Sequence, residues 1–462
     1  MNPVPDRPAR LLLLGGLAVG LVARLVFAVA DDGLWWPDEY YQALEPAHRA
    51  VFGYGWQAWE FLEGARHWTL PGLVAALMKV SEAAGLPYLR VIEFSFCLVG
   101  SATGYAVSLL ARAQGASQRA SAISAAVFSL MGLAVFIAPR AMGEGLSGLP
   151  ITLAFALLFM APSRGKVIAA GLLLSLAVGL RLQNGLFCLG ALAVLWRLKG
   201  PVALLLGVLV VGAVGYGLVD QLTWGEPFHS ARAYLRFNLV EGRASAFGTS
   251  PFFHYVSAFV TAEGLTFVPL VLLTALGARK RPELPLIVLG FFLVHSLIPH
   301  KELRFLFPLV PLLAAQAALG LDLVKPKVQL AVLALAGLSL LTLPWLTFGR
   351  LGIHDPPRDT SALDFGGPEN RLLIRAGKLD DLCGLRLASL THWRTGGYAY
   401  FHHRAPIYRA DKPEEGAGHY NYVIARHGTV EGTELAVDHD VALIKLNDAP
   451  CTPDPTYDWH LE

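Results

Sequence analysis

The stretch LLLLGGLAVGLVARLVFAVA (residues 11–30) decides the fold class of the chain, and PVALLLGVLVVGAVGYGLV (residues 201–219) repeats its character further along. A helix of about 20 apolar residues spans the hydrocarbon core of a bilayer, which is about 30 Å thick. Of the 462 residues, 54% are hydrophobic and 16% are charged, whereas soluble domains average about 25% charged residues. The sequence therefore predicts a multi-span membrane protein and excludes a soluble enzyme, a disordered chain and a fibrous protein.

The charge balance argues against a polyanionic partner. The chain has 37 Lys and Arg residues against 35 Asp and Glu residues, a formal net charge of +2, so nothing indicates a nucleic-acid partner. The first apolar run is followed by Asp31-Asp32-Gly33 and lacks a small-residue cleavage pattern. We therefore expect a retained first helix and not a signal peptide.

Apolar runs predict eleven membrane spans in an all-α polytopic fold. The expected spans are 9–29, 90–111, 119–138, 145–161, 166–181, 184–197, 201–219, 257–277, 283–299, 304–322 and 327–348. The run at 70–85 carries Lys79, Ser81 and Glu82, which suits a lipid-facing span poorly.

The basic residues decide whether 70–85 crosses the membrane. If it does not cross and the N-terminus is cytoplasmic, five basic loops are all cytoplasmic, as the positive-inside rule requires. These loops contain Arg112 and Arg119, Arg164 and Lys166, Arg197 and Lys199, Arg279-Lys280-Arg281, and Lys325 and Lys327. If it crosses, all five face outward. We therefore predict eleven spans with the first loop (30–89), the second long loop (220–256) and the C-terminal segment outside.

The C-terminal segment differs in character from the spans. We expect a membrane domain over 1–350 and a small extracytoplasmic α/β domain over 351–462, with strands near 372–375, 421–425 and 441–446. Cys383 and Cys451 lie in this segment, and a disulfide between them is plausible if it is extracytoplasmic. Cys97 and Cys188 lie in apolar runs and are expected to be packing residues.

The first loop contains WPDEYYQALEPAHRAVFGYGWQAWEF (36–61). Pro37 suits the first turn of a helix, and Asp38 and Glu39 follow where the helix dipole favours negative charge. We expect an amphipathic interfacial helix whose polar face carries Asp38, Gln42, Glu45 and Arg49, with an interfacial aromatic belt formed by Tyr40, Tyr41, Tyr54, Trp56 and Trp59. Two interpretations of Asp38 and Glu39 remain open: a solvated capping pair, or a general base at the mouth of a membrane cavity.

A second segment, HKELRFLFPLVP (300–311), places His300, Lys301 and Arg304 at the outer end of a span. These residues either snorkel and anchor the helix end or form an anion clamp for a phosphate group.

The two segments together resemble the signatures of glycosyltransferase family 22, the dolichyl-phosphate-mannose-dependent mannosyltransferases of GPI-anchor and N-glycan assembly. The HKELRF stretch is similar to the family's HKExRF motif. Further similarity lies in Gly64-Ala65-Arg66-His67, Leu70-Pro71-Gly72, Asp220, Trp224-Gly225, Phe237-Asn238-Leu239-Val240-Glu241-Gly242 and Phe247-Gly248-Thr249-Ser250-Pro251. The resemblance runs in order over residues 30–310.

The resemblance implies a GT-C fold and an inverting transfer of mannose from a polyprenyl-phosphate donor to a hydroxyl of a glycan or glycolipid, on the extracytoplasmic side. On this hypothesis Asp38 is the general base, with Glu39 beside it in the catalytic site. Donor phosphate would be bound by His300, Lys301, Arg304 and Arg66. Acceptor or sugar would be bound by Gln42, Trp59, Glu60, Arg140, Asn238 and Glu241. The hypothesis requires the acidic and cationic segments to share one cavity.

No metal cofactor is expected, because a lipid phosphate is already a good leaving group and arginine and lysine can replace a divalent cation. Asp38 with Glu39 is the alternative metal-binding pair. The small polar loops suggest a bacterial protein in the plasma membrane, or one facing the lumen of the endoplasmic reticulum if eukaryotic.

Three alternatives remain open. A GT-C transferase using polyprenyl-phosphate galactose, glucose or arabinose differs by only a few pocket contacts. A lipid or sugar transporter is disfavoured because the titratable residues gather at one face instead of the midplane. A structural scaffold leaves the Asp38 and Lys301 segments unexplained.

Overall fold

The computed structural model describes residues 6–446 and 451–461. The chain folds into two compact units. The first contains the residues up to Phe27, His67–Leu70 and Glu93–Thr360, and the second contains Ala28–Arg66, Pro71–Ile92 and the residues from Ser361 onward.

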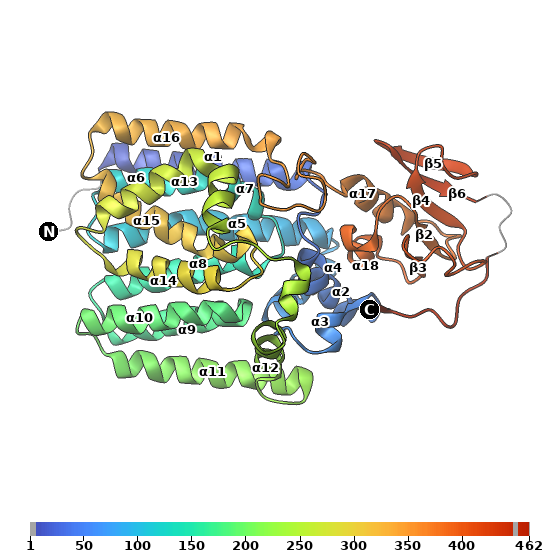
Figure 1. Cartoon of the computed structure of the whole chain (residues 1–462), viewed down its shortest axis with the longest axis horizontal. Helices are drawn as coiled ribbons and strands as arrows, with labels where there is room; N and C mark the ends of the chain where they lie inside the picture. The colour runs from blue at the N-terminus through green and yellow to red at the C-terminus, as the bar shows by residue number, and fades with distance from the viewer. Residues whose placement is uncertain (1–5, 447–450, 462) are drawn as a thin grey trace. The chain divides into compact units, whose positions relative to one another are not determined.

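Helices form most of the first unit, and each predicted span coincides with one or two of them. They are α1 (Arg7–Ala30), α5 (Tyr88–Ala113), α6 (Gln118–Leu130), α7 (Gly132–Ile137), α8 (Gly143–Phe159), α9 (Arg164–Leu180), α10 (Gly185–Arg197), α11 (Val202–Trp224), α13 (His254–Gly277), α14 (Glu283–Leu297), η5 (Leu303–Leu309), α15 (Val310–Leu321) and α16 (Pro326–Leu341). Figure 1 shows α8, α9, α10 and α11 running side by side, and these helices are packed against one another.

Five helical segments of the described chain are long and apolar enough to cross a membrane. They are α1, α5, α11, α13 and the continuous η5–α15 segment Leu303–Leu321. Helices α8, α14 and α16 are apolar but shorter. The chain is therefore a multi-pass membrane protein, and the count of eleven spans stays a prediction.

The apolar helices differ in what surrounds them. Leu303–Leu321 is 94% buried over its most apolar window, because α6, α8, α13 and α14 pack around it. Helix α11 is only 11% buried, and its Val211, Val214, Leu218 and Leu222 are exposed. A helix that is apolar on all sides and exposed is covered by lipid, so α11 presents a lipid-facing surface.

The predicted span 119–138 is interrupted at Met131, between α6 and α7. Two buried charged residues from other helices satisfy the freed backbone groups. Arg24 Nη1 donates to the carbonyl of Ser129 at 2.8 Å, and the backbone N–H of Leu133 donates to Glu263 Oε2 at 2.7 Å. The cation lies at the C-terminal end of α6 and the anion at the N-terminal end of α7, which is the favourable arrangement for both helix dipoles.

The second unit contains the first-loop elements η1 (Tyr40–Leu44), α2 (Glu45–Phe52), β1 (Gln57–Ala58) and α3 (Trp59–Leu62), and most of α4 (Thr69–Ala84). It also contains α17 (Gly367–Ala376), η7 (His392–Arg394), α18 (Gly397–Phe401) and a five-stranded sheet. The strand order is β3 (Ile407–Tyr408), β2 (Leu385–Leu387), β4 (Tyr422–Arg426), β6 (Val441–Lys445) and β5 (Thr433–Asp438). Strand β2 is parallel to both neighbours, whereas β6 is antiparallel to β4 and β5.

The strands predicted near 421–425 and 441–446 are confirmed as β4 and β6. The strand predicted near 372–375 is wrong, because this stretch lies inside helix α17. Pro368 occupies the first turn of α17, and Leu372, Leu373 and Ala376 are buried on one side of it. These positions follow the spacing of a helix, not the alternation of a strand.

The units also differ from the predicted division at residue 350, because the first loop groups with the C-terminal segment and not with the helices. Strand β1 pairs in parallel with β7 (His460–Leu461). The side chain of Arg371 bridges Asp364, Asp438 and Asp32 of the first loop. Cys383 and Cys451 form a disulfide, with their Cα atoms 6.2 Å apart.

Candidate functional site

The first loop gathers four of the predicted site residues. Gln42 Nε2 donates to Glu60 Oε1 at 2.9 Å, and Arg66 Nη2 lies 3.7 Å from the same oxygen. Burial raises the pKa of the Glu60 carboxyl, the Arg66 guanidinium opposes this shift, and the charge of Asp38 adds to it. Asp38 is half-buried and Glu60 is buried. We call Asp38, Gln42, Glu60 and Arg66 the acidic group.

Glu39 and Trp59 lie beside this group in the sequence but differ in environment. Glu39 Oε1 accepts hydrogen bonds from the backbone N–H groups of Trp35 and Trp36, at 3.0 and 3.1 Å. Its carboxylate therefore fixes the turn that precedes the helix. Trp59 is half-buried at the start of α3.

The expected polar face of the first-loop helix is not a solvated surface. Glu45 is buried, and its Oε1 accepts a hydrogen bond from the backbone N–H of Tyr398 at 2.7 Å. Burial raises the pKa of Glu45 to about 8, against the opposing effect of backbone N–H groups and Arg49. The helix carries a π-helical turn over Tyr40–Leu44 before it continues as α2.

The expected aromatic belt is also wrong for three of its five members. Tyr40, Tyr41 and Trp56 are 1–2% exposed. The Trp56 Nε1 group donates to Tyr457 Oη at 2.9 Å, and Tyr41 Oη donates to the carbonyl of His392 at 2.5 Å. These side chains pack against the C-terminal segment within the second unit, so they are core residues of this unit.

The HKELRF segment forms a chain of ion pairs in the first unit. Glu302 accepts from Arg304 Nε at 2.6 Å, and its other carboxylate oxygen lies 2.8 Å from His300 Nε2. Arg304 Nε also lies 3.9 Å from Glu144 Oε1, which accepts a hydrogen bond from Arg181. We call His300, Glu302, Arg304, Glu144 and Arg181 the ion-pair chain. It has one more cation than anion when His300 is protonated.

His300 and Lys301 also hold the second loop. Burial lowers the pKa of His300, but the hydrogen bond and charge of Glu302 outweigh it, so that the pKa is raised overall. His300 Nδ1 lies 3.1 Å from the carbonyl of Gly248. Lys301 Nζ donates to the carbonyls of Ile298 at 2.6 Å and Ser250 at 2.9 Å. The ammonium group therefore ties the second loop to the HKELRF segment.

Three further predicted residues lie elsewhere in the first unit. Arg140 is buried, and its guanidinium lies over the ring of Phe136 at 4.4 Å. Asn238 Nδ2 donates to the carbonyl of Tyr234 at 2.8 Å. Glu241 accepts a hydrogen bond from Arg236 Nε at 2.5 Å and lies exposed. The acidic group belongs to the second compact unit, and the ion-pair chain belongs to the first.

Sequence reasoning assigned no role to a buried network around Asp220. Ser230 donates to Asp220 through its backbone N–H at 2.9 Å and through its hydroxyl, and His67 Nε2 lies 3.8 Å from Asp220 Oδ1. Burial lowers the pKa of His67, against the effect of the Asp220 carboxylate. The His67 ring stacks on Tyr216 at 3.8 Å. His67 lies in the stretch Gly64-Ala65-Arg66-His67, and both this stretch and Asp220 resemble glycosyltransferase family 22. This similarity is the sequence signal from which the network could be found.

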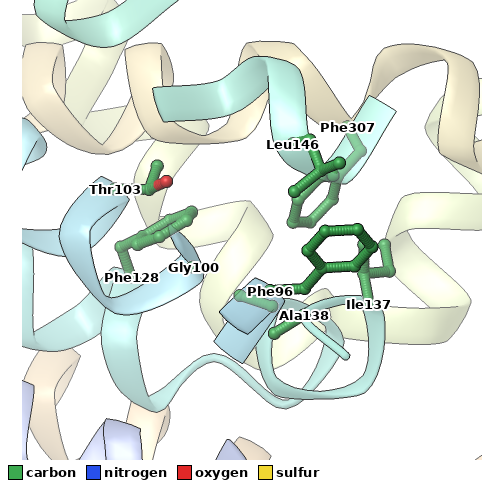
Figure 2. Close-up of a pocket in the computed structure, with 10 residues that line it drawn as sticks. Phe96, Gly100, Thr103, Phe128, Ile137, Ala138, Leu146 and Phe307 are labelled. Atoms are coloured by element: carbon green, nitrogen blue, oxygen red, sulfur yellow. The ribbon is translucent and has the colours of Figure 1, made fainter. Parts of the chain in front are cut away.

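Figure 2 shows a cavity among the helices of the first unit, lined by apolar side chains that include Phe96, Phe128, Leu146 and Phe307. The hydroxyl of Thr103 also lines it but donates to the carbonyl of Val99 at 2.9 Å. No predicted site residue lines this cavity. Within residues 6–446 and 451–461, no group of three or more His, Cys, Asp or Glu side chains is arranged to hold a metal ion.

Residues 17–351 match the model of the Alg9-like mannosyltransferase family. The chain belongs to this family. The resemblance to glycosyltransferase family 22 is thereby confirmed.

Curated relatives of this Alg9-like chain include GPI mannosyltransferase 3 of Yarrowia lipolytica, which is 32% identical over 330 residues, covering 68% of the chain and 63% of the relative. GPI alpha-1,2-mannosyltransferase 3 of Bos taurus is 26% identical over 290 residues, covering 60% and 53%. The matched part of the chain thus spans about half to three-fifths of these relatives. The relatives described here are eukaryotic, so the expectation of a bacterial protein is not borne out.

Solved structures support the GT-C fold. ArnT from Cupriavidus metallidurans bound to undecaprenyl phosphate has a TM-score of 0.63 at 13% identity, covering 96% of this chain and 99% of that one. The Archaeoglobus fulgidus oligosaccharyltransferase has a TM-score of 0.54 at 13% identity, covering 91% and 69%. At these identities the similarity concerns the fold.

Proposed function

We propose that this Alg9-like chain is an inverting mannosyltransferase that uses a polyprenyl-phosphate-mannose donor and a glycan or glycolipid acceptor. The observation that carries the proposal is the match of residues 17–351 to a mannosyltransferase family. The side-chain geometry supports it in two places, the acidic group and the ion-pair chain. The lipid bilayer is the third partner, because the donor is a lipid.

We assign the general base to Asp38. It accepts the proton of the acceptor hydroxyl while that oxygen attacks the anomeric carbon, and the bond from this carbon to the phosphate oxygen breaks with inversion. A positioned base contributes roughly 10²–10⁴-fold to such a step. Glu60 is buried, and its Oε1 already accepts a hydrogen bond from Gln42 and lies 3.7 Å from Arg66 Nη2, so we do not assign the base to it. We propose that Glu60 and Gln42 bind hydroxyl groups of the sugar.

We assign stabilisation of the departing lipid phosphate to Arg304 and His300. Glu302 and Glu144 neutralise part of their positive charge, and with Arg181 included the ion-pair chain keeps a single excess positive charge when His300 is protonated. Charge-assisted hydrogen bonds to phosphate oxygens are strong in a site that excludes water. Lys301 supports this assignment indirectly, because its ammonium group holds the backbone carbonyl of Ile298, two residues before His300, and that of Ser250 in the second loop.

We also propose that transfer takes place on the extracytoplasmic side and needs no metal. The first proposal rests on the five basic loops. The second rests on the monophosphate leaving group and on cations that arginine and histidine supply. Activity that is unchanged by a chelator supports the second proposal, and activity that returns only when a divalent cation is restored contradicts it.

The donor is tested with the purified chain and radiolabelled polyprenyl-phosphate sugars offered one at a time with an acceptor extract. We expect transfer from the mannosyl donor. Transfer from a galactosyl, glucosyl or arabinosyl donor instead would keep the enzyme class and change the donor. No transfer from any donor, with the chain shown to be folded, would overturn the proposed function.

A further inference from the structure

The second long loop joins α11 to α13 and carries an unusually apolar exposed surface. It contains α12 (His229–Leu235), the π-helical turn η3 (Arg236–Val240) and the short 3-10 helix η4 (Arg243–Phe247). In this segment the large apolar side chains that point outward are Phe228, Leu235, Leu239, Val240, Phe247, Phe252 and Phe253. Val240 is 81% exposed and Phe253 is 69% exposed. We call residues 225–253 the interfacial loop.

Internal contacts fix the fold of the interfacial loop at both ends. Asp220 accepts from the backbone N–H of Ser230 at its beginning, and the backbone N–H of Ser250 donates to the carbonyl of Pro299 at 2.9 Å near its end. Between them Phe237 and Ala244 are buried. The exposed apolar side chains therefore belong to a folded segment, in which the buried Phe237 contacts Phe247 and Arg243 of the same loop.

This exposed face continues the lipid-facing surface of the two helices that it connects. Leu218 and Leu222 are exposed in the last turns of α11, and Val256 and Val260 are exposed in the first turns of α13. Helix α12 packs against α11, and Figure 1 shows it beside the end of that helix. Because both ends of the loop are attached to helices that are long and apolar enough to cross a membrane, the loop begins and ends at the level where the membrane meets water.

The charged residues of the loop fit the same location. Arg232, Arg236 and Arg243 are exposed, and each forms an ion pair with Glu226 or Glu241. Arginine side chains beside apolar side chains are typical of segments that lie in the headgroup region and insert their apolar side chains into the acyl chains. A soluble surface rarely exposes this many large apolar side chains together.

We propose that the interfacial loop lies in the bilayer surface, with Leu239, Val240 and Phe253 inserted among phospholipid acyl chains. The partner is bilayer phospholipid. The proposal is independent of which sugar or acceptor the chain uses, because it rests on the exposed side chains and their attachment to α11 and α13.

Depth-dependent fluorescence quenching tests the proposal. The Val240→Cys variant, made with Cys188→Ser, is labelled with an environment-sensitive fluorophore and reconstituted into phosphatidylcholine vesicles that carry a nitroxide at acyl carbon 5 or carbon 12. Val211→Cys, in the middle of α11, is the deep control, and Thr429→Cys, an exposed residue of a turn in the second unit, is the aqueous control. The Cys188→Ser protein alone gives the labelling blank.

We expect the carbon-5 nitroxide to quench the Val240 probe at least about threefold more strongly than the Thr429 probe, and the carbon-12 nitroxide to quench the Val211 probe most. A Val240 probe that is quenched by aqueous iodide as strongly as the Thr429 probe would overturn the proposal. A probe shielded from both quenchers would also overturn it, because the surface would then be covered by protein, such as a second copy of the chain. If Val240→Cys does not fold, Phe253→Cys is labelled instead, and the same pattern of quenching is expected for its probe.

Discussion

At the scale of single residues, Asp38 is the side chain on which the proposed chemistry depends most directly. Asp38→Asn keeps the shape of the side chain but removes the basic carboxylate. We expect the transfer rate to fall by roughly 10²–10⁴-fold, while expression and donor binding stay unchanged. The measurement is initial rate at saturating donor with the purified variant.

The matched control is Asp380→Asn, because Asp380 is an exposed aspartate of the second unit. It should transfer at the normal rate. Near-normal turnover by Asp38→Asn would show that Asp38 is not the general base. Asp38 and Glu39 would then be interpreted as a pair that caps the first turn of the helix.

Glu45 gives a second prediction, on stability. Burial raises its pKa to about 8 from an ordinary value of 4.5. Between these pH values the folded chain holds a proton that the unfolded chain has released, so stability falls as pH rises, by at most about 1.4 kcal/mol per pH unit. Glu45→Gln removes this dependence, and its amide oxygen still accepts from the N–H of Tyr398.

We therefore expect the apparent melting temperature of Glu45→Gln, minus that of the unchanged chain, to increase from pH 5 to pH 8 in detergent solution. A difference that stays constant over this range would show that Glu45 is already ionised in the folded state. Glu431→Gln is the control, since Glu431 is exposed.

At the scale of elements, the contacts of Lys301 connect the HKELRF segment to the second loop. Its ammonium group donates to the carbonyls of Ser250 and Ile298. Hydrogen bonds to a charged group contribute about 1.5–3 kcal/mol each. Lys301→Met removes them, so trypsin cleavage after Arg243 should become at least about tenfold faster in detergent solution, as local opening becomes easier.

Lys280→Met, in the exposed loop after α13, should leave this cleavage rate unchanged. If Lys301→Met weakens donor binding without faster cleavage, then Lys301 acts on the phosphate directly and not through the second loop.

Element by element, the sequence predicts the helices well where the apolar runs are long. It does not predict the interruption of span 119–138, because the groups that make the break stable, Arg24 and Glu263, are distant in the sequence. The α17 error has a different cause. The short apolar stretch 372–375 predicts a strand by itself, although Pro368, two residues after Gly366, is a start signal for a helix.

The candidate site is predictable to a similar degree. Asp38, Gln42, Glu60 and Arg66 come from one loop and lie together in the structure, and the roles that the sequence assigns to them stay predictions. The burial of Glu45 and Trp56 was not predictable, because their partners Tyr398 and Tyr457 lie more than three hundred residues further along the chain. The amphipathic pattern of a helix shows that it has two faces, and it does not show that protein covers both.

At the scale of the whole molecule, the predicted topology is open to a parity test within the first unit. Lys280 lies between α13 and α14, and Lys325 lies between α15 and α16, so that two predicted spans separate them. Glu226 lies in the loop after α11, one predicted span before Lys280. Basic loops remain on the cytoplasmic side, so Lys280 and Lys325 should share one side of the membrane and Glu226 should lie on the other.

Single cysteines at these three positions, in the Cys188→Ser background, are labelled with a membrane-impermeant maleimide in sealed vesicles of known orientation. We expect Lys280→Cys and Lys325→Cys to be labelled from the cytoplasmic side and Glu226→Cys from the opposite side, with all three labelled after the vesicles are opened. If Lys280 and Lys325 were labelled from opposite sides, one of the segments 283–299 and 304–322 would not cross the membrane. The eleven-span topology would then be wrong, and the HKELRF segment would lie on the cytoplasmic side if the segment that fails to cross is 283–299.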